Sequence, residues 1–320
     1  MEYRSLGNCG TKVSAFGLGA WTTFGESVSD RHTIAAVLRT ALEAGINFFD
    51  MADAYAKGEA EREMGSVLAE LPRHELVISS KTYFPMSDEV NDRGLSRKHI
   101  MESVEKSLKR IGTDYIDLYF CHRFDPNTPV EETARAMDDL VHQGKVLYWG
   151  TSEWTGKQLH NIHKLCRECH LYRPQVEQPQ YSLLARAKFE QDVQPAAVEH
   201  GMGLVTWSPL ALGMLTGKYD DGFPEGARLS RVDWLREWAY SEERRDRVRR
   251  FKACADQLGC TRTQLALAWL AAQEGVSSVI LGVTHVDQLR ENLDALKIEI
   301  PQQMLKDLDV LFPPDGTMDS

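Results

Sequence analysis

An apolar strand followed by an amphipathic helix recurs eight times along this 320-residue chain, and this repetition constrains the fold more than any other feature. The predicted strands are, in chain order, residues 13–19, 46–50, 75–81, 115–122, 145–152, 174–178, 203–208 and 277–282. After the first strand, Asp30 can cap a helix whose apolar residues recur at helical spacing from Ile34 to Leu42. Because no proline-rich or low-complexity linker interrupts the series, we predict an α/β fold in which residues 1–320 form a single (β/α)8 TIM barrel domain.

Two segments depart from this repeat. Residues 3–15, YRSLGNCGTKVSA, place turn-forming residues between two short strand-like segments and predict an N-terminal β-hairpin. Residues 212–242 follow the seventh strand and are rich in Gly, Asp, Arg and Trp, which predicts a long loop of the kind that often carries function. Further helices are expected near residues 130–143, 155–169, 188–200, 243–258 and 261–272, the last two lying before the eighth strand.

The charge balance narrows the kinds of partner. Acidic residues outnumber basic ones by 47 to 37, and the net charge of −10 argues against nucleic acid or an anionic membrane surface as the main partner. The N-terminal residues lack the basic and apolar regions of a secretory signal, and no window approaches the roughly 18–20 apolar residues of a membrane helix. The six cysteines are scattered like reduced thiols, so we expect a cytoplasmic protein.

Four ionisable residues follow three successive predicted strands. Asp50 ends the second strand and Tyr55 lies on the loop beyond it, while Lys81 and His122 end the next two strands. Because active sites of parallel barrels form at the carboxyl ends of the strands, these side chains are expected to meet. A phenol is a weak acid at neutral pH unless a cation stabilises its anion, and a carboxylate can hold that cation in place. The set therefore predicts carbonyl reduction, with Tyr55 as the proton donor, Lys81 and Asp50 as its support, and His122 orienting the carbonyl.

Each of these residues has an ordinary structural alternative. Taken singly, the aspartate could cap a helix, the tyrosine could pack a loop and the lysine could be solvated, but their convergence at three strand ends favours catalysis. Five aromatic residues that follow strand ends are candidates for a substrate pocket, although they could equally pack loops against the barrel. They are Trp21, Tyr83, Phe84, Phe124 and Trp154.

Several longer motifs resemble a known family. The segments FFDMADAY, SSK, CHR, GTSEW, EQPQY and TWSPLALGMLTGKY are similar to the aldo-keto reductases. GLSRKHI, DPNTPVEET, LYWGTS and GVSSVILG resemble the branch that includes the voltage-gated potassium channel β subunits and their bacterial and plant relatives. The resemblance runs from about residue 3 to about residue 310 and implies a barrel that reduces aldehydes and ketones with NADPH. Where the animal channel subunits have an amide side chain, this chain has His122, as the working enzymes do.

The same resemblance implies a binding site for NADPH or NADP+. Trp207 would stack on the nicotinamide, Ser152 and Gln178 would hold its carboxamide, and the segment around Thr284 would meet the adenosine end, where a helix N-terminus suits a 2′-phosphate. The implied contacts are Ala20, Trp21, Asp50, Ser152, Gln178, Trp207, Ser208, Pro209, Leu210, Ala211, Leu212, Gly213, Lys218, Arg228, Gly282, Thr284, Gln288, Glu291 and Asn292. Gln288 stands where many members of the family have arginine, which leaves the choice between NADPH and NADH open. Glu153, directly after Ser152, stands where members often have Asn or Arg, and the sequence suggests no role for it.

Two functions of other classes compete with a reductase that acts on a small carbonyl compound. One is a redox-sensing NADP(H)-binding regulatory subunit that docks on a partner such as an ion channel, and the other is a silent scaffold that binds no cofactor. The predicted hairpin begins almost at Met1, so we expect no N-terminal extension of the kind that plugs a pore. The resemblance also makes a homo-tetramer possible.

Three further motifs carry competing interpretations. GLGAWT, from Gly17, lacks the third glycine of a dinucleotide-binding loop, and GMLTGKY, from Gly213, departs from the spacing of a P-loop. A helix stripe of His160, His163, Cys166, Cys169 and His170 could hold a metal, but it also holds core leucines, and we predict no metal site. The arginines from Arg231 to Arg250 alternate with acidic residues and predict a solvated helix face.

Overall fold

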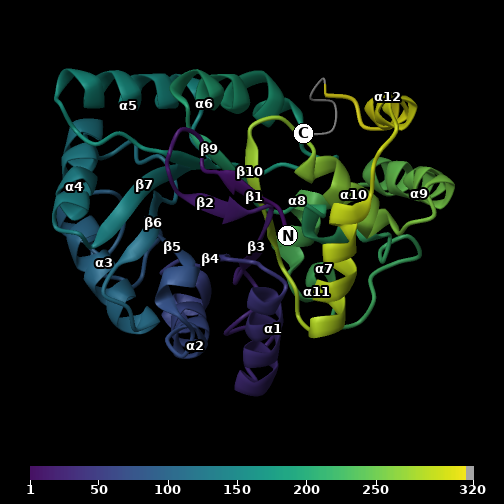
Figure 1. Ribbon diagram of the computed structural model, residues 1–320, viewed down its shortest axis with the longest axis horizontal. Helices are drawn as coiled ribbons and strands as arrows, with labels where there is room; N and C mark the ends of the chain where they lie inside the picture. Colours follow the sequence, from purple (N-terminus) through teal and green to yellow (C-terminus); the bar gives the residue numbers. More distant parts are fainter. Residues whose placement is uncertain (315–320) are drawn as a thin grey trace.

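The computed structural model describes residues 1–314 and confirms the predicted barrel. Eight parallel strands close in the order β10-β3-β4-β5-β6-β7-β8-β9, so the last strand pairs with the first, and helices surround them (Figure 1). The barrel strands are β3 (Phe16–Gly19), β4 (Phe48–Asp50), β5 (Val77–Thr82), β6 (Ile116–Cys121), β7 (Val146–Ser152), β8 (Val176–Gln178), β9 (Gly203–Thr206) and β10 (Val276–Leu281). The predicted strands match them to within a few residues.

The helices that cover the barrel begin where the sequence carries capping residues. Asp30 accepts hydrogen bonds from the backbone N–H groups of His32 and Thr33, as predicted, and Thr155 forms a capping box with Gln158. The helices that follow strands β3 to β8 are α1 (Arg31–Glu43), α2 (Glu59–Leu68), α3 (Arg97–Ile111), α4 (Val130–His142), α5 (Gly156–Glu168) and α6 (Gln194–His200), the last preceded by a π-turn, η3 (Phe189–Val193).

The N-terminal hairpin covers the amino ends of the strands. Its strands, β1 (Tyr3–Ser5) and β2 (Lys12–Ser14), are antiparallel, and Leu6 and Val13 join the apolar cluster inside the barrel. Gly17, which opens GLGAWT, lies on β3, where a Cβ would come 2.5 Å from the Phe48 ring. Packing inside the barrel therefore requires this glycine, and no dinucleotide-binding loop is formed. Because the hairpin covers the amino ends of the strands, we expect a functional site at their carboxyl ends.

The predicted loop of residues 212–242 is more structured than the sequence suggested. It contains a 3₁₀ turn, η4 (Ala211–Thr216), and two short helices, α7 (Arg228–Arg231) and α8 (Asp233–Ala239). The helices α9 (Glu242–Gln257) and α10 (Arg262–Ala271) follow before β10, near the predicted places, and α11 (Val286–Leu293) with the turn η5 (Asp294–Lys297) completes the eighth unit. A last helix, α12 (Gln302–Leu311), was not predicted, and it packs on α9 through Phe312 and Phe251.

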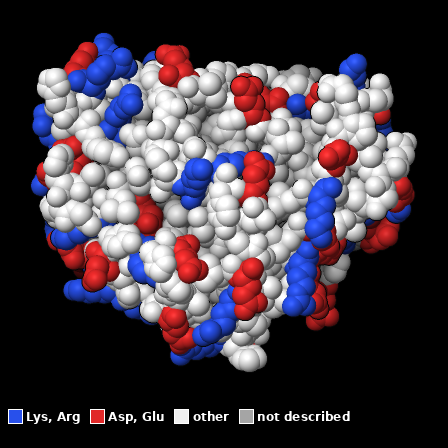
Figure 2. Space-filling view, in the orientation of Figure 1, with Lys and Arg blue, Asp and Glu red and all other residues white. Residues whose placement is uncertain are grey.

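The surface mixes both signs of charge. On the face that Figure 2 shows, acidic and basic side chains alternate over the helices, in keeping with the scattered charges of the sequence. Within residues 1–314, no helix is both long enough and apolar enough to cross a membrane.

Candidate active site

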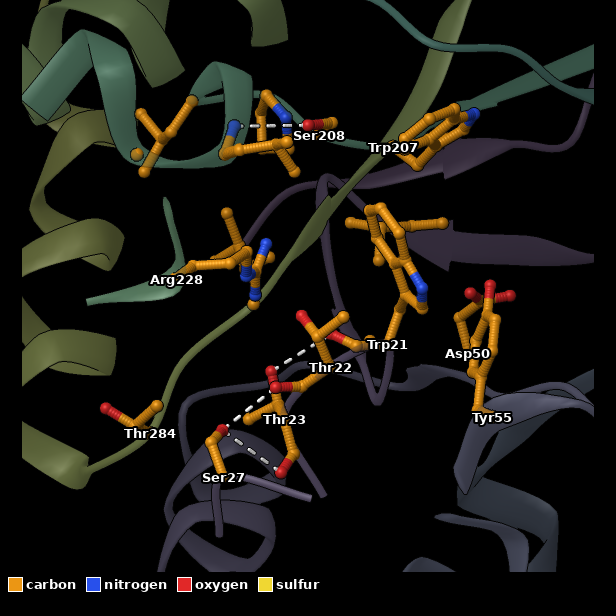
Figure 3. A pocket seen from close by; sticks show the side chains of 18 of the residues that line it. Trp21, Thr22, Thr23, Ser27, Asp50, Tyr55, Trp207, Ser208, Arg228 and Thr284 are labelled. Carbon is orange, nitrogen blue, oxygen red and sulfur yellow. Dashed lines mark hydrogen bonds between the residues drawn. The ribbon is translucent and has the colours of Figure 1, made fainter. Parts of the chain in front are cut away.

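One cavity of about 680 Å³ opens at the carboxyl ends of the strands. Asp50, Tyr55 and His122 line one end of it, which we call the reacting end, and Lys218, Arg228 and Thr284 line the other, the phosphate end. In Figure 3, Trp21 lies between Asp50 and Tyr55 on one side and Arg228 and Thr284 on the other, with Trp207 above it. Its size is typical of a ligand or cofactor site.

A buried ion pair forms the base of the reacting end. Lys81 is fully buried on β5, and its Nζ donates to Asp50 Oδ2 at 2.7 Å and to the Met51 carbonyl at 2.7 Å. Asp50 Oδ1 accepts hydrogen bonds from Ser79 Oγ at 2.6 Å and from Gln178 Nε2 at 3.0 Å. Burial lowers the pKa of Lys81, and the Asp50 carboxylate opposes this change. Both charges are therefore held in fixed positions by neighbouring strands.

Tyr55 and His122 face each other above this pair. Their ring centres lie 5.6 Å apart in a T-shaped arrangement, and Lys81 Nζ lies 4.7 Å from the centre of the Tyr55 ring. Burial raises the pKa of Tyr55 well above its usual range, and the Asp50 charge adds to the rise, so the phenol keeps its proton at neutral pH. Burial also lowers the pKa of His122 well below its usual range, with the Lys81 charge adding to the effect, so the imidazole is neutral. The site thus holds a protonated phenol next to a neutral hydrogen-bonding ring.

Glu153 acquires a role that the sequence did not suggest. Its backbone adopts the left-handed conformation, with φ of 61°, which carries strain for a residue other than glycine. Its Oε1 accepts hydrogen bonds from the Trp207 indole N–H at 3.0 Å and the Gln180 backbone N–H at 2.6 Å, and its Oε2 pairs with Lys188 Nζ at 2.6 Å. Glu153 therefore fixes the Trp207 ring, whose edge-to-face partner is Trp21 at 5.4 Å.

Ser152 and Gln178 lie where the resemblance implies a carboxamide-binding pair. The Ser152 hydroxyl donates to the Gln178 backbone carbonyl at 2.8 Å, and both residues line the cavity. Since the Gln178 amide nitrogen donates to Asp50, its Oε1 points elsewhere, and no donor among residues 1–314 reaches that oxygen. An amide N–H₂ group of a ligand would satisfy it.

The phosphate end carries positive charge without counterions. Lys218, Arg228 and Arg231 all line the cavity, and none of them forms an ion pair with a carboxylate in the described part of the chain. Burial, followed by the charge of Arg228, lowers the pKa of Lys218. The segment that precedes Lys218 is left-handed at Ser208, Ala211 and Leu212. These residues bend the chain around the cavity at a cost in strain.

The adenosine end suggested by the resemblance contains an unsatisfied amide. Asn292 on α11 is 1% exposed and lines the cavity, and neither its Oδ1 nor its Nδ2 has a hydrogen-bond partner among residues 1–314. Such a group normally costs stability, so its presence indicates a missing partner. Thr284 and Gln288 are already joined, because Gln288 Oε1 accepts from the Thr284 backbone N–H at 2.9 Å. With the free cations and Gln178 Oε1, this orphaned amide fits a dinucleotide with phosphate and amide groups.

Some predicted site residues lie outside the cavity lining. Lys81 lies beneath the cavity, Tyr83 packs edge-to-face on Phe84, and Phe124 packs on the buried Trp154. The predicted residues that do not line the cavity are Lys81, Tyr83, Phe124, Trp154, Ala20, Ala211 and Glu291. The remaining predicted catalytic, cofactor and substrate-pocket residues do line it.

Sequence reasoning missed several residues of the lining. Arg231 on α7 and Trp234 on α8 both line the cavity. Arg231 is exposed, in keeping with the predicted solvated face, but its place at the cavity was not predicted. Helices as short as α7 and α8 show no periodic signal from which the cavity contact of either residue could have been predicted. Arg123 could have been found, because it directly follows His122 at the end of β6.

The histidines of the rejected metal motif form a different group. His160 Nδ1 lies 2.8 Å from Nε2 of His200 on α6, and the His163 ring stacks on His200 at 4.2 Å. The side chains whose ligand atoms come within 4.8 Å of one another are His160, Glu199 and His200, none of which lines the cavity. Burial raises the pKa of Cys166 to about 12, so this thiol stays protonated inside the core.

Comparison with known proteins places this geometry in context. The model of the aldo/keto reductase family matches residues 15–312. A relative from Arabidopsis thaliana is 43% identical over 303 residues, which cover 93% of this chain and 92% of the relative. Another from Schizosaccharomyces pombe is 41% identical over 321 residues, covering 98% of this chain and 93% of the relative. Both carry provisional names as voltage-gated potassium channel β subunits.

Proposed function

Because this chain belongs to the aldo/keto reductase family, we propose that it reduces an aldehyde or ketone to an alcohol with NADPH, and that Tyr55 supplies the proton. The observation that carries the proposal is the buried Lys81–Asp50 pair, 2.7 Å long, beneath the ring of Tyr55. If the Lys81–Asp50 pair only stabilised the fold, the protonated Tyr55 and the neutral His122 at the cavity wall would have no explanation. Catalysis explains all four residues together.

The residues of the reacting end divide the proton chemistry among them. His122 donates a hydrogen bond to the carbonyl oxygen and turns it toward Tyr55. As hydride reaches the carbonyl carbon, the C=O π pair moves to oxygen, and Tyr55 transfers its phenolic proton there. The phenolate that remains is stabilised by the Lys81 ammonium, which Asp50 keeps charged and in place. A water proton then restores the phenol.

The remaining cavity fits the cofactor that this reaction requires. Bound NADPH supplies the hydride. Trp207, fixed by Glu153, offers a flat face for the nicotinamide, and Gln178 Oε1 offers an acceptor for its amide. Lys218 and Arg228 offer charge for the phosphates, and Asn292 offers both of its unpaired amide atoms. We expect a preference for NADPH over NADH, because Lys218, Arg228 and Arg231 form no ion pair among the described residues and can bind the additional phosphate of NADPH.

The test is NADPH consumption by the purified protein with a panel of aldehydes, among them 4-nitrobenzaldehyde and methylglyoxal. Turnover by the wild type and its loss in Tyr55→Phe, with NADPH binding by calorimetry retained, supports the proposal. Equal turnover in the variant would remove Tyr55 as the acid. Absence of NADPH binding would overturn the whole assignment.

A second candidate function is a redox-sensing regulatory subunit that binds NADP(H) and docks on a partner such as an ion channel. The provisional names of both relatives favour it. A slow reductase could also serve as a sensor, so the turnover rate with NADPH and an aldehyde distinguishes the two functions. Tight NADPH binding with negligible turnover across the panel would support the sensor, whereas rapid turnover would support the reductase.

A further inference from the structure

Arg123 is a charged residue of the reacting end to which the proposed mechanism gives no task. It follows His122 immediately after β6 and lines the cavity, half-buried. One of its Nη atoms donates to the backbone carbonyl of His122 at 2.5 Å, and its guanidinium carbon lies 5.5 Å from the centre of the Phe84 ring. Phe84 in turn contacts the His122 ring at 4.8 Å. The guanidinium is therefore anchored on the wall that carries the carbonyl-orienting residue.

This guanidinium has no carboxylate of its own. Within residues 1–314, Arg123 forms no ion pair, and only one of its several N–H donors is used. The acidic side chains nearby are committed elsewhere, Asp50 to Lys81 and Glu153 to Lys188. With Tyr55 and His122 both neutral, the reacting end keeps one uncompensated positive charge.

The charge acts directly on the reacting groups. Burial and then Lys81 lower the pKa of His122, and Arg123 lowers it further. Arg123 also opposes the rise that burial and Asp50 produce in the pKa of Tyr55. The contacts of Phe84 with both Arg123 and His122 place this charge on the same wall as the carbonyl-orienting ring.

The cofactor does not account for Arg123. Three other cavity cations, Lys218, Arg228 and Arg231, come from the segment after β9, and Arg228 lies over the Trp21 ring at 5.8 Å. Arg123 comes from the end of β6, beside Tyr55 and His122. An anion that pairs with it must therefore enter with the carbonyl group.

Building on the proposed function, we propose that Arg123 selects carbonyl compounds that carry a carboxylate, so that the substrate class is aldehyde or oxo acids. The guanidinium fork matches the two oxygens of a carboxylate, and the aromatic ring of Phe84 beside it shields the contact from water. The carboxylate then fixes the distance and direction of the carbonyl group relative to Tyr55 and His122.

The experiment compares two aldehydes of nearly equal size that differ in charge, 4-carboxybenzaldehyde and 4-nitrobenzaldehyde. We measure kcat/KM for both in the wild type, in Arg123→Met and in Arg123→Lys. Arg123→Met should lower the ratio of carboxylated to nitro substrate by about 10- to 100-fold, and Arg123→Lys should restore part of it. Loss of the charge also alters Tyr55, but that effect falls on both substrates alike, and the ratio removes it.

A matched control removes a charge from the other end of the same cavity. Arg228→Met should weaken NADPH binding and leave the substrate ratio as in the wild type. A ratio that falls equally in both variants would mean that overall cavity charge, and not Arg123, is responsible, and would overturn the inference.

The outcomes separate this inference from the function on which it rests. If the wild type reduces neither aldehyde, the proposed function fails. If it reduces both and Arg123→Met leaves the ratio unchanged, the function stands and the selection of acids fails. Should Arg123→Met not fold, competitive inhibition by benzoate gives an independent readout, which must be weaker in Arg123→Lys than in the wild type; equal inhibition would contradict the inference.

Discussion

The ion pair at the base of the reacting end and the cations of the phosphate end handle charge in opposite ways. At the reacting end, barrel strands hold Lys81 against Asp50, and the pair is complete without any ligand. At the phosphate end, Lys218 and Arg228 sit on or beside a bent segment outside the strands and form no ion pair among the described residues. The base of the reacting end is thus preorganised by the protein alone, whereas the cations of the phosphate end are available for an anion that the described residues do not supply.

The largest effect is expected on kcat when Tyr55, which lies over the Lys81–Asp50 pair, is replaced. Tyr55→Phe removes the proton donor but keeps the ring over Lys81, so kcat should fall by about 10²- to 10⁴-fold. The dissociation constant for NADPH, measured by calorimetry, should stay within about twofold of the wild-type value, because the phosphate end is untouched. A large loss of NADPH affinity would show that the two ends are not independent.

The next test compares one lysine from each end. Lys81→Met leaves the buried Asp50 charge without its cation and should lower the free energy of unfolding by about 3–5 kcal/mol. Lys218→Met removes a cation that has no carboxylate partner, so the stability of the cofactor-free protein should change by less than about 0.5 kcal/mol. Urea unfolding of both variants measures the two free energies of unfolding. Equal losses in Lys81→Met and Lys218→Met would contradict the difference between the two ends of the cavity.

Arg228→Ala probes the phosphate end alone. Loss of a charged hydrogen-bond donor to phosphate should raise the dissociation constant for NADPH by about 10- to 100-fold. The kcat measured at saturating NADPH should change little by comparison. An unchanged dissociation constant would remove Arg228 from the cofactor site.

Asp53 is expected to make the stability of the fold depend on pH. This carboxyl is fully buried and accepts a hydrogen bond from Ser103, and burial, followed by the charge of Glu61, raises its pKa to about 7. Because the folded protein holds this proton more tightly than the unfolded chain, the stability that Asp53 contributes is lost as pH rises from about 4 through 7. Asp53→Asn should therefore be more stable than the wild type at about pH 8 by more than about 1 kcal/mol, a gain that shrinks at about pH 5. The same gain at both pH values would contradict this account.

The smallest effect is expected at Glu153, between the two ends. Glu153→Gln keeps an acceptor for the Trp207 indole and loses the Lys188 pair, whereas Glu153→Ala loses both. The KM for NADPH should rise by about threefold to tenfold in the alanine variant and less in the glutamine variant. An equal rise in both would assign the effect to Lys188 and not to the position of Trp207.

The sequence was sufficient for the barrel and for the proximity of Asp50, Tyr55, Lys81 and His122, because both depend on local signals. Each strand carries its own apolar run, and Asp50, Lys81 and His122 mark where three of them end, so parallel pairing brings them together. The segment after β9 has no such period, and the sequence therefore did not predict that Arg231 and Trp234 line the cavity. The task of Glu153 depends on Trp207 and Lys188, which lie far along the chain, and the pairing of His160 with His200 likewise spans 40 residues. No local pattern encodes these contacts.

The indole rings along the cavity give the protein an optical signature. Trp21 meets Trp207 at 5.4 Å, and Trp207 stacks on Trp238 of α8 at 6.3 Å, so the three indole rings form a chain from the loop after β3 to α8. Rings this close couple electronically and give intense near-ultraviolet circular dichroism. Reduced nicotinamide absorbs light in the range where indoles emit. Binding of NADPH at the proposed site would therefore quench tryptophan fluorescence and transfer the energy to the dihydropyridine ring. The fluorescence would then report, without a label, whether NADPH or NADP+ is bound in the cavity.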